Sequence, residues 1–381
     1  MKPLLSIVIP TKNRQEYCRK TINHITSIQT QDIQLVIQDN SDEDILREFC
    51  NQKKDYRIDY FYSAQRMNIS ENFELAVKNI IGEYFIFLGD DDSIHPNIIE
   101  IVKFFKSKGA ESIVPRFPMY YVYPNPERGE NGNLNYLKPS SKYSIVKTQK
   151  ELTNLVKKGL LDYNHTSLPR PYHGIIKTSV LKKIKDKNMK LFNGVSPDIY
   201  SCIILSNFIT ESYHVDFPFS IAGACPQSGS SMGTNKTHCG RLEDAMHFKG
   251  REIIWTERLP RYYSVETIWA FAGIQALIDT KSYDRLKLFN VNRMVARSLL
   301  MNTSIFNIIL TEYKVFSKNN ITMKINLMVF FMVDFLSIFY TKALRKWEIY
   351  ILKRRKIYTG VESFADAINL FNANSHTFNY N

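Results

Sequence analysis

The sequence predicts an α/β fold, in which a mostly parallel sheet is flanked by helices and followed by an α-helical C-terminal region. From residue 4 to residue 120, short apolar runs alternate with segments of helical period, as expected for βαβ units. Beyond about residue 260 the helical period continues almost throughout, most clearly in SVETIWAFAGIQALI (264–278). With 381 residues, the chain is long enough for about two domains of about 150 residues each.

The first 120 residues contain the expected strands and the helices between them. The strands are the apolar runs LLSIVIP (4–10), IQLVIQDN (33–40), YFIFLGDDD (84–92) and ESIVPRF (111–117). Between them, apolar side chains recur at helical spacing, so each helix can cover a face of the sheet. These side chains are Cys18, Ile22 and Ile25, then Phe73, Ala76, Val77 and Ile80, and, after Pro96, Ile98, Ile101, Val102 and Phe105.

The middle of the chain is less regular. Residues 118–146 are rich in Tyr, Pro, Asn and Gly, which predicts an irregular segment and a candidate active-site flap. A helix is expected in TQKELTNLVKKG (148–159), where Thr148 and Glu151 predict a capping box and Gly159 predicts the stop. A further strand pair is expected in HGIIK (173–177) and SYHVDFPFSIAG (212–223).

The charge of the chain favours an anionic partner. The net charge of +13 and the pI near 9.3 suit a nucleic acid, an acidic lipid surface or a phosphorylated substrate, without choosing among them. The five cysteines are widely spaced and contain no CxxC pair, so we expect reduced thiols in a cytosolic protein and no zinc site. The first apolar run stops at a proline after about six residues, which argues against a signal peptide or a spanning helix there.

Polar side chains gather where the expected strands end. Asp90, Asp91 and Asp92 follow one strand directly, and their mutual repulsion in a partly dehydrated cleft must be offset by a cation or by hydrogen-bond donors. Oxygen ligands without histidine or cysteine suit Mg²⁺ or Mn²⁺, although a solvated acidic loop before the next helix is the alternative. Ligands bind at this edge of an open α/β sheet, which favours the metal site. The other polar residues at this edge are Thr11, Asn13, Arg14, Asp39 and Asn40.

Three sequence blocks occur in a specific order and spacing. They are LSIVIPTKNR (5–14), LVIQDNSDED (35–44) and QRMNISENFELAVKNIIGEYFIFLGDDDSIHP (65–96). HGIIKTSVLKKI (173–184) and SPDIYS (196–201) add weaker matches. Together these blocks resemble the family 2 nucleotide-sugar glycosyltransferases over about the first 230 residues. The resemblance implies the GT-A fold and transfer of a sugar from a nucleoside diphosphate donor.

The resemblance assigns roles to residues at matching positions. Arg14 would line the nucleotide pocket, and Asp39 would accept hydrogen bonds from the base; the alternatives are a solvated arginine and a turn-forming DNSD cluster. Asp90 to Asp92 would correspond to the DxD motif, with one carboxylate on the ribose and another, Asp91 or Asp92, on Mn²⁺ or Mg²⁺. Many relatives carry an aspartate in place of Gly89, which leaves open which of the three binds the ion. The expected nucleotide-sugar set is Pro10, Thr11, Asn13, Arg14, Asp39, Arg66, Asn68, Asp90 and Asp91.

Sugar transfer also needs a general base for the acceptor hydroxyl. In GVSPDIYSCIILSNF (194–208), Ser196 predicts an N-cap and Pro197 a first helical residue, which places Asp198 in the first turn. The helix field keeps a carboxylate there ionised, so Asp198 is the candidate catalytic base; the alternative is that it only complements the helix dipole. The resemblance places the catalytic carboxylate in this region, often as an acidic pair, and here only one acid stands.

Two further features belong to the expected acceptor and donor sides. His173 precedes a glycine at a strand entry, where it is either an acceptor-side residue or a structural histidine. The small, polar segment GACPQSGSSMGTNKTH (223–238) is either a lid over the donor or an ordinary surface loop.

The segment 321–356 combines apolar and basic residues. Its apolar stretch of about 16 residues is interrupted by Asp334 and is shorter than the ~20 needed to span a bilayer. Basic residues follow it, at Lys342, Arg345, Lys346 and LKRRK (352–356). This composition predicts peripheral attachment to anionic lipid, and the alternative is a core helix with a solvated basic neighbour. The QxxRW motif and multiple spanning helices of processive relatives are absent from the sequence, so polymerisation through a membrane channel is not expected.

These observations predict three parts: a GT-A catalytic domain at 1–230, a lid or linker at 231–260, and a helical region at 261–381 that contacts a membrane or another copy. Within the catalytic domain, 1–117 would bind the nucleotide sugar and 118–230 the acceptor. The expected activity is metal-dependent, inverting transfer of one sugar, from a UDP-sugar, to a hydroxyl of a glycan or lipid-linked acceptor. The expected location is the cytoplasm or the inner face of the cytoplasmic membrane.

Two other functions remain as alternatives. A sugar-phosphate nucleotidyltransferase would use the same sheet edge and metal but would release pyrophosphate. A nucleic-acid-binding protein would explain the net charge of +13, but the aspartate triplet argues against it because phosphate backbones avoid such a surface, so no nucleic acid is expected.

Overall fold

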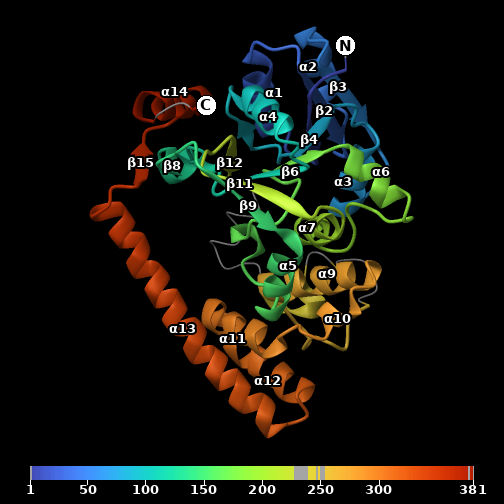
Figure 1. Ribbon diagram of the computed structural model, residues 1–381, viewed down its shortest axis with the longest axis vertical. Helices are drawn as coiled ribbons and strands as arrows, with labels where there is room; N and C mark the ends of the chain where they lie inside the picture. The colour runs from blue at the N-terminus through green and yellow to red at the C-terminus, as the bar shows by residue number, and fades with distance from the viewer. Residues whose placement is uncertain (1, 227–238, 246–247, 249–253, 376–377, 381) are drawn as a thin grey trace.

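The main sheet is mixed and mostly parallel, as predicted. The computed structural model describes residues 2–226, 239–245, 248, 254–375 and 378–380. Its largest sheet has the strand order β3-β2-β1-β4-β10-β6-β11-β9 (Figure 1). The strands are β1 (Leu5–Thr11), β2 (Ile33–Asp39), β3 (Ile58–Tyr62), β4 (Tyr84–Phe87), β6 (Ser112–Pro115), β9 (Tyr143–Lys147), β10 (Ile175–Lys177) and β11 (Glu211–Val215).

Parallel pairing brings the carboxyl ends of the first strands to one edge. β1 lies between β2 and β4 and pairs in parallel with both, with Thr11 opposite Asp39. β10 runs antiparallel between β4 and β6. β6 lies between β10 and β11, so the two strands that the sequence predicted as a pair are not neighbours. β3, in the segment IDYFY, is a strand that the sequence analysis missed; its residues are mostly only partly buried because it is an edge strand.

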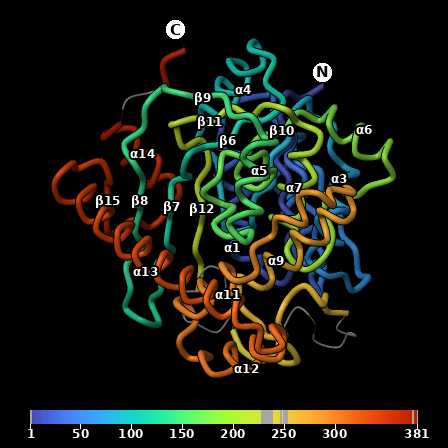
Figure 2. The backbone as a smooth tube through the Cα atoms, turned by 60° about the horizontal axis from the view of Figure 1, so that its bottom comes forward, coloured from blue at the N-terminus to red at the C-terminus, as the bar shows by residue number. Residues whose placement is uncertain are grey.

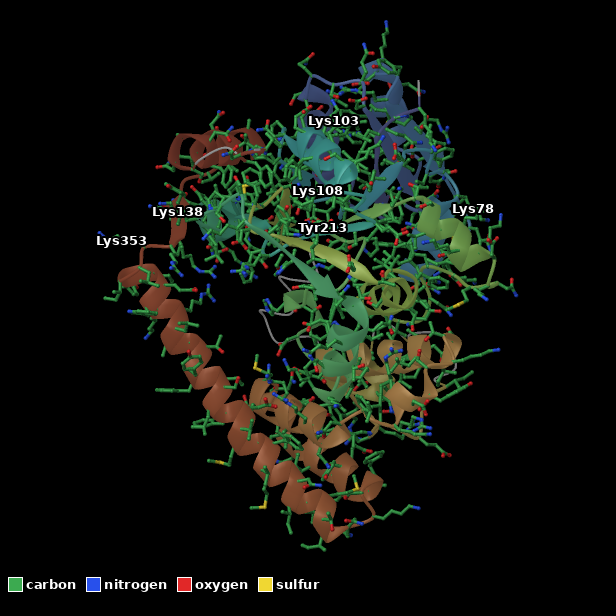
Figure 3. The ribbon with its side chains drawn as sticks, viewed as in Figure 1. Lys78, Lys103, Lys108, Lys138, Tyr213 and Lys353 are labelled. Carbon is green, nitrogen blue, oxygen red and sulfur yellow. The ribbon has the colours of Figure 1, made fainter. Side chains whose placement is uncertain are left out.

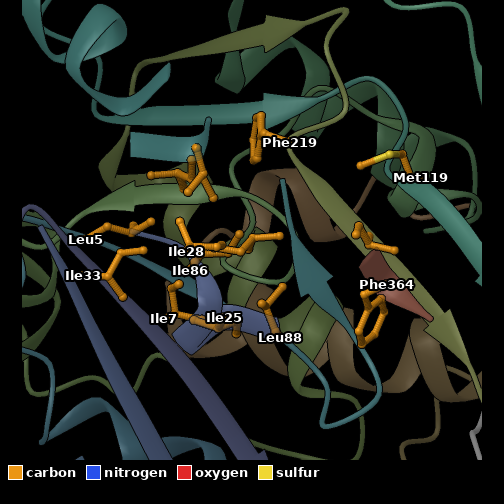
Figure 4. Close-up of a cluster of buried hydrophobic side chains, with 14 of the residues drawn as sticks. Leu5, Ile7, Ile25, Ile28, Ile33, Ile86, Leu88, Met119, Phe219 and Phe364 are labelled. Carbon is orange, nitrogen blue, oxygen red and sulfur yellow. The ribbon is translucent and has the colours of Figure 1, made fainter. Parts of the chain in front are cut away.

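Alternate residues of β1 supply two separate cores. Leu5 and Ile7 pack with α1 on one face of the sheet, in a cluster shown in part in Figure 4. Val8 packs on the other face with α3 and α7. The helices of this part are α1 (Gln15–Ser27), α2 (Leu46–Lys53), α3 (Ile69–Val77), α4 (Ile98–Ser107), α5 (Thr148–Lys157), α6 (Ser179–Lys185) and α7 (Pro197–Phe208). The helical spacing read from the sequence therefore identifies the buried face of α1, where Cys18, Ile22 and Ile25 are buried.

The segment predicted to be an irregular flap is mostly β structure. Residues 118–146 contain β7, β8 and the start of β9, because buried Met119 and Tyr121 alternate with exposed Tyr120 and Val122. These strands build a second sheet in the order β15-β8-β7-β12-β5 (Figure 2). Its strands are β5 (Ser93–Ile94), β7 (Met119–Val122), β8 (Asn133–Leu137), β12 (Ser220–Ala224) and β15 (Arg355–Thr359).

The predicted capping box at the start of α5 is not formed. Thr148 is the first residue of α5 and its hydroxyl donates to the carbonyl of Ile209, so it is not available to the backbone of Glu151. Gly159 lies just after the helix with φ +77°, as expected for a stop signal.

The C-terminal region is helical up to residue 350 and then returns to the first core. Its helices are α9 (Val265–Asp279), α10 (Tyr283–Leu286), α11 (Val291–Met301), α12 (Phe306–Phe316), α13 (Ile321–Tyr350) and α14 (Phe364–Asn374). The short elements are η1 (Pro126–Arg128), η2 (Tyr163–His165), η3 (Leu242–Asp244), η5 (Thr303–Ile305), β13 (Gly240–Arg241) and β14 (Tyr262–Tyr263). β15 pairs antiparallel with β8, and α14 buries Phe364 and Phe371 in the same cluster as Ile7. The end of the chain is therefore part of the first structural unit.

α13 is longer than the apolar run in the sequence suggested. It continues for 30 residues through Asp334 and is long and apolar enough to cross a membrane by length and composition alone. Asp334 is fully buried, and Arg293 and Arg297 of α11 each approach its Oδ1 to 3.3 Å. These ion pairs fasten one face of α13 to α11, and the helix runs along one side of the molecule (Figures 1 and 3).

Candidate active site

A cavity of about 770 Å³ opens at the carboxyl edge of the main sheet. Its floor consists of the residues that follow β1 and β4, and the start of α3 forms one wall. Tyr120 and Gly223 of the second sheet, Asp198 of α7 and Trp269 of α9 close the other sides. Of the predicted site residues, those that line the cavity are Pro10, Thr11, Arg14, Asn68, Asp90, Asp91, Asp92, His173 and Asp198.

Arg14 lies between two of the three aspartates. Its NH1 lies 2.9 Å from Asp90 Oδ1, and its NH2 lies 2.8 Å from Asp91 Oδ2. Thr11 Oγ1 also donates to Asp90 Oδ2 at 2.7 Å. The sequence required something positive beside these carboxylates, and Arg14 meets part of that requirement.

Asp92 is bonded differently from its two neighbours. The backbone N–H groups of Gly89 and Gly223 donate to its Oδ2 and Oδ1 at 2.6 and 2.8 Å. Tyr172 donates to Oδ2 at 2.7 Å, and His173 Nε2 lies 3.3 Å from the same oxygen. Both oxygens of Asp92 are therefore engaged with groups of the protein, which ties the aspartate loop to the strands beside it.

Burial separates the pKa values of the three carboxyl groups. Burial raises the pKa of Asp90 to about 7, against the lowering effect of the Arg14 charge. Burial and the charge of Asp92 also raise the pKa of Asp91. For Asp92, burial acts in the same direction, but His173, Tyr172 and Gly223 outweigh it and lower the pKa. The raised pKa values mean that Arg14 does not fully compensate the negative charges of Asp90 and Asp91. A further cation beside these two carboxylates would therefore be favourable.

The donor set suits a hard divalent ion shared with a substrate. Among the residues that the structure describes, no group of three or more His, Cys, Asp and Glu side chains forms a metal centre by itself. Mg²⁺ and Mn²⁺ bound with substrate phosphates need only one or two protein carboxylates, and Asp91 can supply one at the cavity floor. Of the two predicted metal residues, Asp91 fits this role better than Asp92, whose oxygens are already engaged.

Three predicted nucleotide residues lie outside the cavity lining. Asp39 is fully buried, and its two oxygens accept from Ser41 N at 2.8 Å and from the Tyr60 hydroxyl at 2.9 Å. Asn13, at φ +55°, donates from Nδ2 to Asp42 at 2.9 Å. Arg66 is exposed. Asn40 and Lys12, which follow β2 and β1, line the cavity in their place.

Asp198 lies in the first turn of α7, as the Ser196-Pro197 signal predicted. Ser196 is the N-cap residue, although its side chain makes no capping hydrogen bond. The Asp198 residue is partly exposed, but burial of its carboxyl group raises its pKa to about 6. The charge of His173 and a hydrogen bond with Tyr163 act in the opposite direction. The helix field therefore does not keep this pKa low, but the carboxyl group is still mostly ionised at neutral pH.

Several cavity residues were not found from the sequence. Tyr120, Tyr163, Arg170, Tyr172 and Trp269 all line the cavity. Tyr172 is the neighbour of His173 and could have been included with it. Trp269 had no signal because it lies more than 170 residues from the aspartates and approaches them only when α9 packs against α7. The predicted lid at 223–238 lies mostly outside the described residues, as do parts of the predicted linker at 231–260.

The main sheet, the acidic loop at its carboxyl edge and the second sheet beside it define a GT-A-type α/β domain. Residues 6–166 match the model of the family described as Glycosyl transferase family 2. Residues 6–166 therefore form a glycosyltransferase family 2 domain, as the sequence blocks implied.

The chain matches part of the length of two curated relatives. Glycosyltransferase GlyG from Streptococcus pneumoniae is 21% identical over 197 residues, which are 51% of this chain and 63% of that protein. The GalNAc(5)-diNAcBac-PP-undecaprenol beta-1,3-glucosyltransferase from Campylobacter jejuni is 30% identical over 95 residues, 24% of this chain and 31% of that protein. The matches thus span from about a third to under two thirds of these relatives. The crystal structure of S. aureus TarS 1-349 with UDP-GlcNAc superposes with a TM-score of 0.45 and 13% identity, covering 82% of this chain and 92% of that one.

Proposed function

We propose that this protein is a metal-dependent, inverting glycosyltransferase that moves one sugar from a nucleoside diphosphate donor, with UDP as the first candidate, to an acceptor hydroxyl. One observation carries the proposal. A buried pair of carboxylates bridged by Arg14 lies on the floor of the same cavity that Asp198, a carboxylate from α7, also lines. This is the arrangement that a donor diphosphate and an acceptor base require.

Each group has a defined task in the transfer. Arg14 binds the diphosphate, and Asp91 would hold a divalent ion that stabilises the charge of the leaving group. Asp198 accepts the proton of the acceptor hydroxyl as its oxygen bonds to the anomeric carbon. The bond from that carbon to the diphosphate breaks at the same time, and attack from the opposite side inverts the configuration. Asp92, held by Tyr172 and His173, keeps the aspartate loop in position.

The acceptor and the location are part of the same proposal. The name of the Campylobacter relative specifies an undecaprenol diphosphate acceptor, which supports a lipid-linked glycan here. α13 supports attachment to an anionic membrane surface, because its outward side chains include Met328, Leu336 and Phe339, each more than half exposed. Contact with a second copy of the chain through the same face is the alternative.

A ligand screen tests the function directly. The protein is heated with UDP, GDP, CDP and dTDP, each with and without Mn²⁺, and we expect one nucleotide to raise the unfolding temperature only when Mn²⁺ is present. The product of the reaction then separates the two enzyme classes. Release of the nucleoside diphosphate supports a glycosyltransferase, whereas release of pyrophosphate would assign the alternative nucleotidyltransferase.

A further inference from the structure

Arg170 is a buried cation without an acidic partner in the described part of the chain. It lines the cavity at 6% exposure. NH1 and NH2 donate to the carbonyl oxygens of Thr166 and Pro115 at 2.9 and 3.3 Å. Because both acceptors are neutral carbonyl groups, these hydrogen bonds do not compensate the positive charge of Arg170. Burial accordingly lowers its pKa. A buried charge of this kind is costly unless an anion approaches it.

A second arginine reaches the same region from the second sheet. Tyr120 of β7 pairs with Asn135 of β8, and Asn135 pairs with Ile357 of β15, so the three side chains share one face of the sheet. Arg355, two residues before Ile357, is on that face too, and its NH1 donates to Asn135 Oδ1 at 3.1 Å. Its Nε is buried without a hydrogen-bond partner in the described structure.

A third arginine comes from α13, which packs beside β15 (Figure 2). Burial and the charge of Arg345 lower the pKa of Arg355, and Glu348 acts in the opposite direction. Burial raises the pKa of Tyr120, whereas the charges of Arg170, Arg355 and Arg345 lower it. Tyr120, a cavity residue, therefore lies within electrostatic range of three guanidinium groups, and Glu348 opposes the charge of Arg345 at Arg355.

This basic cluster is distinct from the aspartate loop. Arg14 is neutralised by Asp90 and Asp91, on the donor side of the cavity. Arg170 influences Tyr163, which bonds to Asp198, so the basic cluster borders the side where the candidate base stands. Arginine forks match phosphate oxygens in geometry and charge, and three of them suit a group with more than one negative charge.

We propose that the acceptor carries a phosphate or diphosphate group, and that Arg170, Arg345 and Arg355 bind it beside Tyr120. This inference rests on the proposed function, because it assigns the acceptor class of the same cavity. The phosphate has two sources: the diphosphate of a lipid-linked glycan, or a phosphate within a glycan chain.

The test measures binding of farnesyl diphosphate and of inorganic diphosphate by calorimetry, with UDP and Mn²⁺ at saturation to fill the donor site. The variant is Arg345→Gln/Arg355→Gln, which leaves buried Arg170 in place and keeps folding risk low. The matched control is Lys342→Gln/Lys346→Gln, which removes the same charge from α13. We expect the variant to bind about ten-fold more weakly or worse, with the control unchanged.

The outcomes separate the sources and the two proposals. Farnesyl diphosphate binding much more tightly than inorganic diphosphate assigns a lipid-linked acceptor, and equal binding assigns a phosphate in a glycan. If UDP binds but neither probe does, or if the variant binds both probes as the wild type does, the phosphate site is wrong and the glycosyltransferase proposal stands. If none of UDP, GDP, CDP and dTDP binds, the proposed function falls and the acceptor assignment falls with it; if one of the others binds in place of UDP, that nucleotide fills the donor site in this test.

Discussion

At the scale of single residues, the three neighbouring aspartates have three different environments. Asp90 and Asp91 share Arg14, whereas Asp92 accepts from two backbone N–H groups and a tyrosine. Adjacent residues of the same type have different partners because the chain turns after β4. The sequence favoured Asp91 and Asp92 for the ion, and the environments in the structure favour Asp91 of these two.

The Asp91→Asn variant tests the donor side. The substitution keeps the shape of the side chain but removes the charge facing Arg14, so we expect affinity for the donor nucleotide with Mn²⁺ to fall by about 100-fold, or about 3 kcal/mol. Calorimetry measures the change. Asp32→Asn, just before β2 at its other end and only partly buried, removes the same charge and should bind normally. Wild-type affinity in Asp91→Asn would refute the site.

The Asp198→Asn variant tests the base. We expect it to bind the donor as the wild type does and to lose ~10² to 10⁴ in transfer rate, because the acceptor hydroxyl then has no proton acceptor. Exposed Asp186→Asn on the neighbouring surface is the matched control. Near-normal turnover in Asp198→Asn would place the base elsewhere.

The pKa of Asp198 also predicts a pH dependence. Because burial raises this pKa to about 6 and the base must be ionised, kcat/KM should decline as the pH falls below about 6. Asp90, whose pKa is about 7, lies on the donor side, so its protonation should change donor affinity. Measuring donor affinity over the same pH range therefore distinguishes an effect of Asp90 from an effect of Asp198. A transfer rate that stays level from pH 7 to pH 5 contradicts the role of Asp198.

At the scale of elements, α13 shows how one acidic residue sets the orientation of a helix. Asp334 faces Arg293 and Arg297 of α11, so the opposite face of α13, which is apolar, remains outward. Lys353, labelled in Figure 3, lies where α13 gives way to β15. An exposed apolar helix face beside basic residues is typical of a helix that lies in a membrane interface.

Membrane contact is tested with Leu336→Ser/Phe339→Ser. Both side chains are exposed, at 59% and 68%, so the protein should fold while losing apolar area for lipid. We expect about ten-fold weaker sedimentation with vesicles that contain anionic lipid. Tyr56→Ser/Ile81→Ser removes exposed apolar groups from the first unit and serves as the control. If the variant sediments like the wild type, lipid does not contact this face; a loss of dimer instead would assign it to a second copy.

At the scale of the whole molecule, the end of the chain closes the structure. β15 and α14 complete the second sheet and the first core, so truncation before residue 355 would remove part of the catalytic unit along with α13. For this reason the membrane test uses substitutions. The return of the chain also explains how Arg345 and Arg355, near the C-terminus, come to lie beside Tyr120.

The sequence by itself determined the parallel strands β1, β2 and β4, the buried faces of the helices α1, α3 and α4, and the acidic edge after β4. These features are local, because hydrophobic period and strand ends can be read within a few residues. It also placed Asp198 in the first turn of a helix, through Ser196 and Pro197.

Only the tertiary structure decided which groups meet across long sequence distances. It paired Arg14 with Asp90 and Asp91, engaged Asp92 with Tyr172, and brought Trp269 into the cavity wall. It also turned the tyrosine-rich segment after residue 118 into strands, because a sheet edge was available for it to pair with. Contacts of this kind depend on how whole layers pack, and no local pattern in the chain records them.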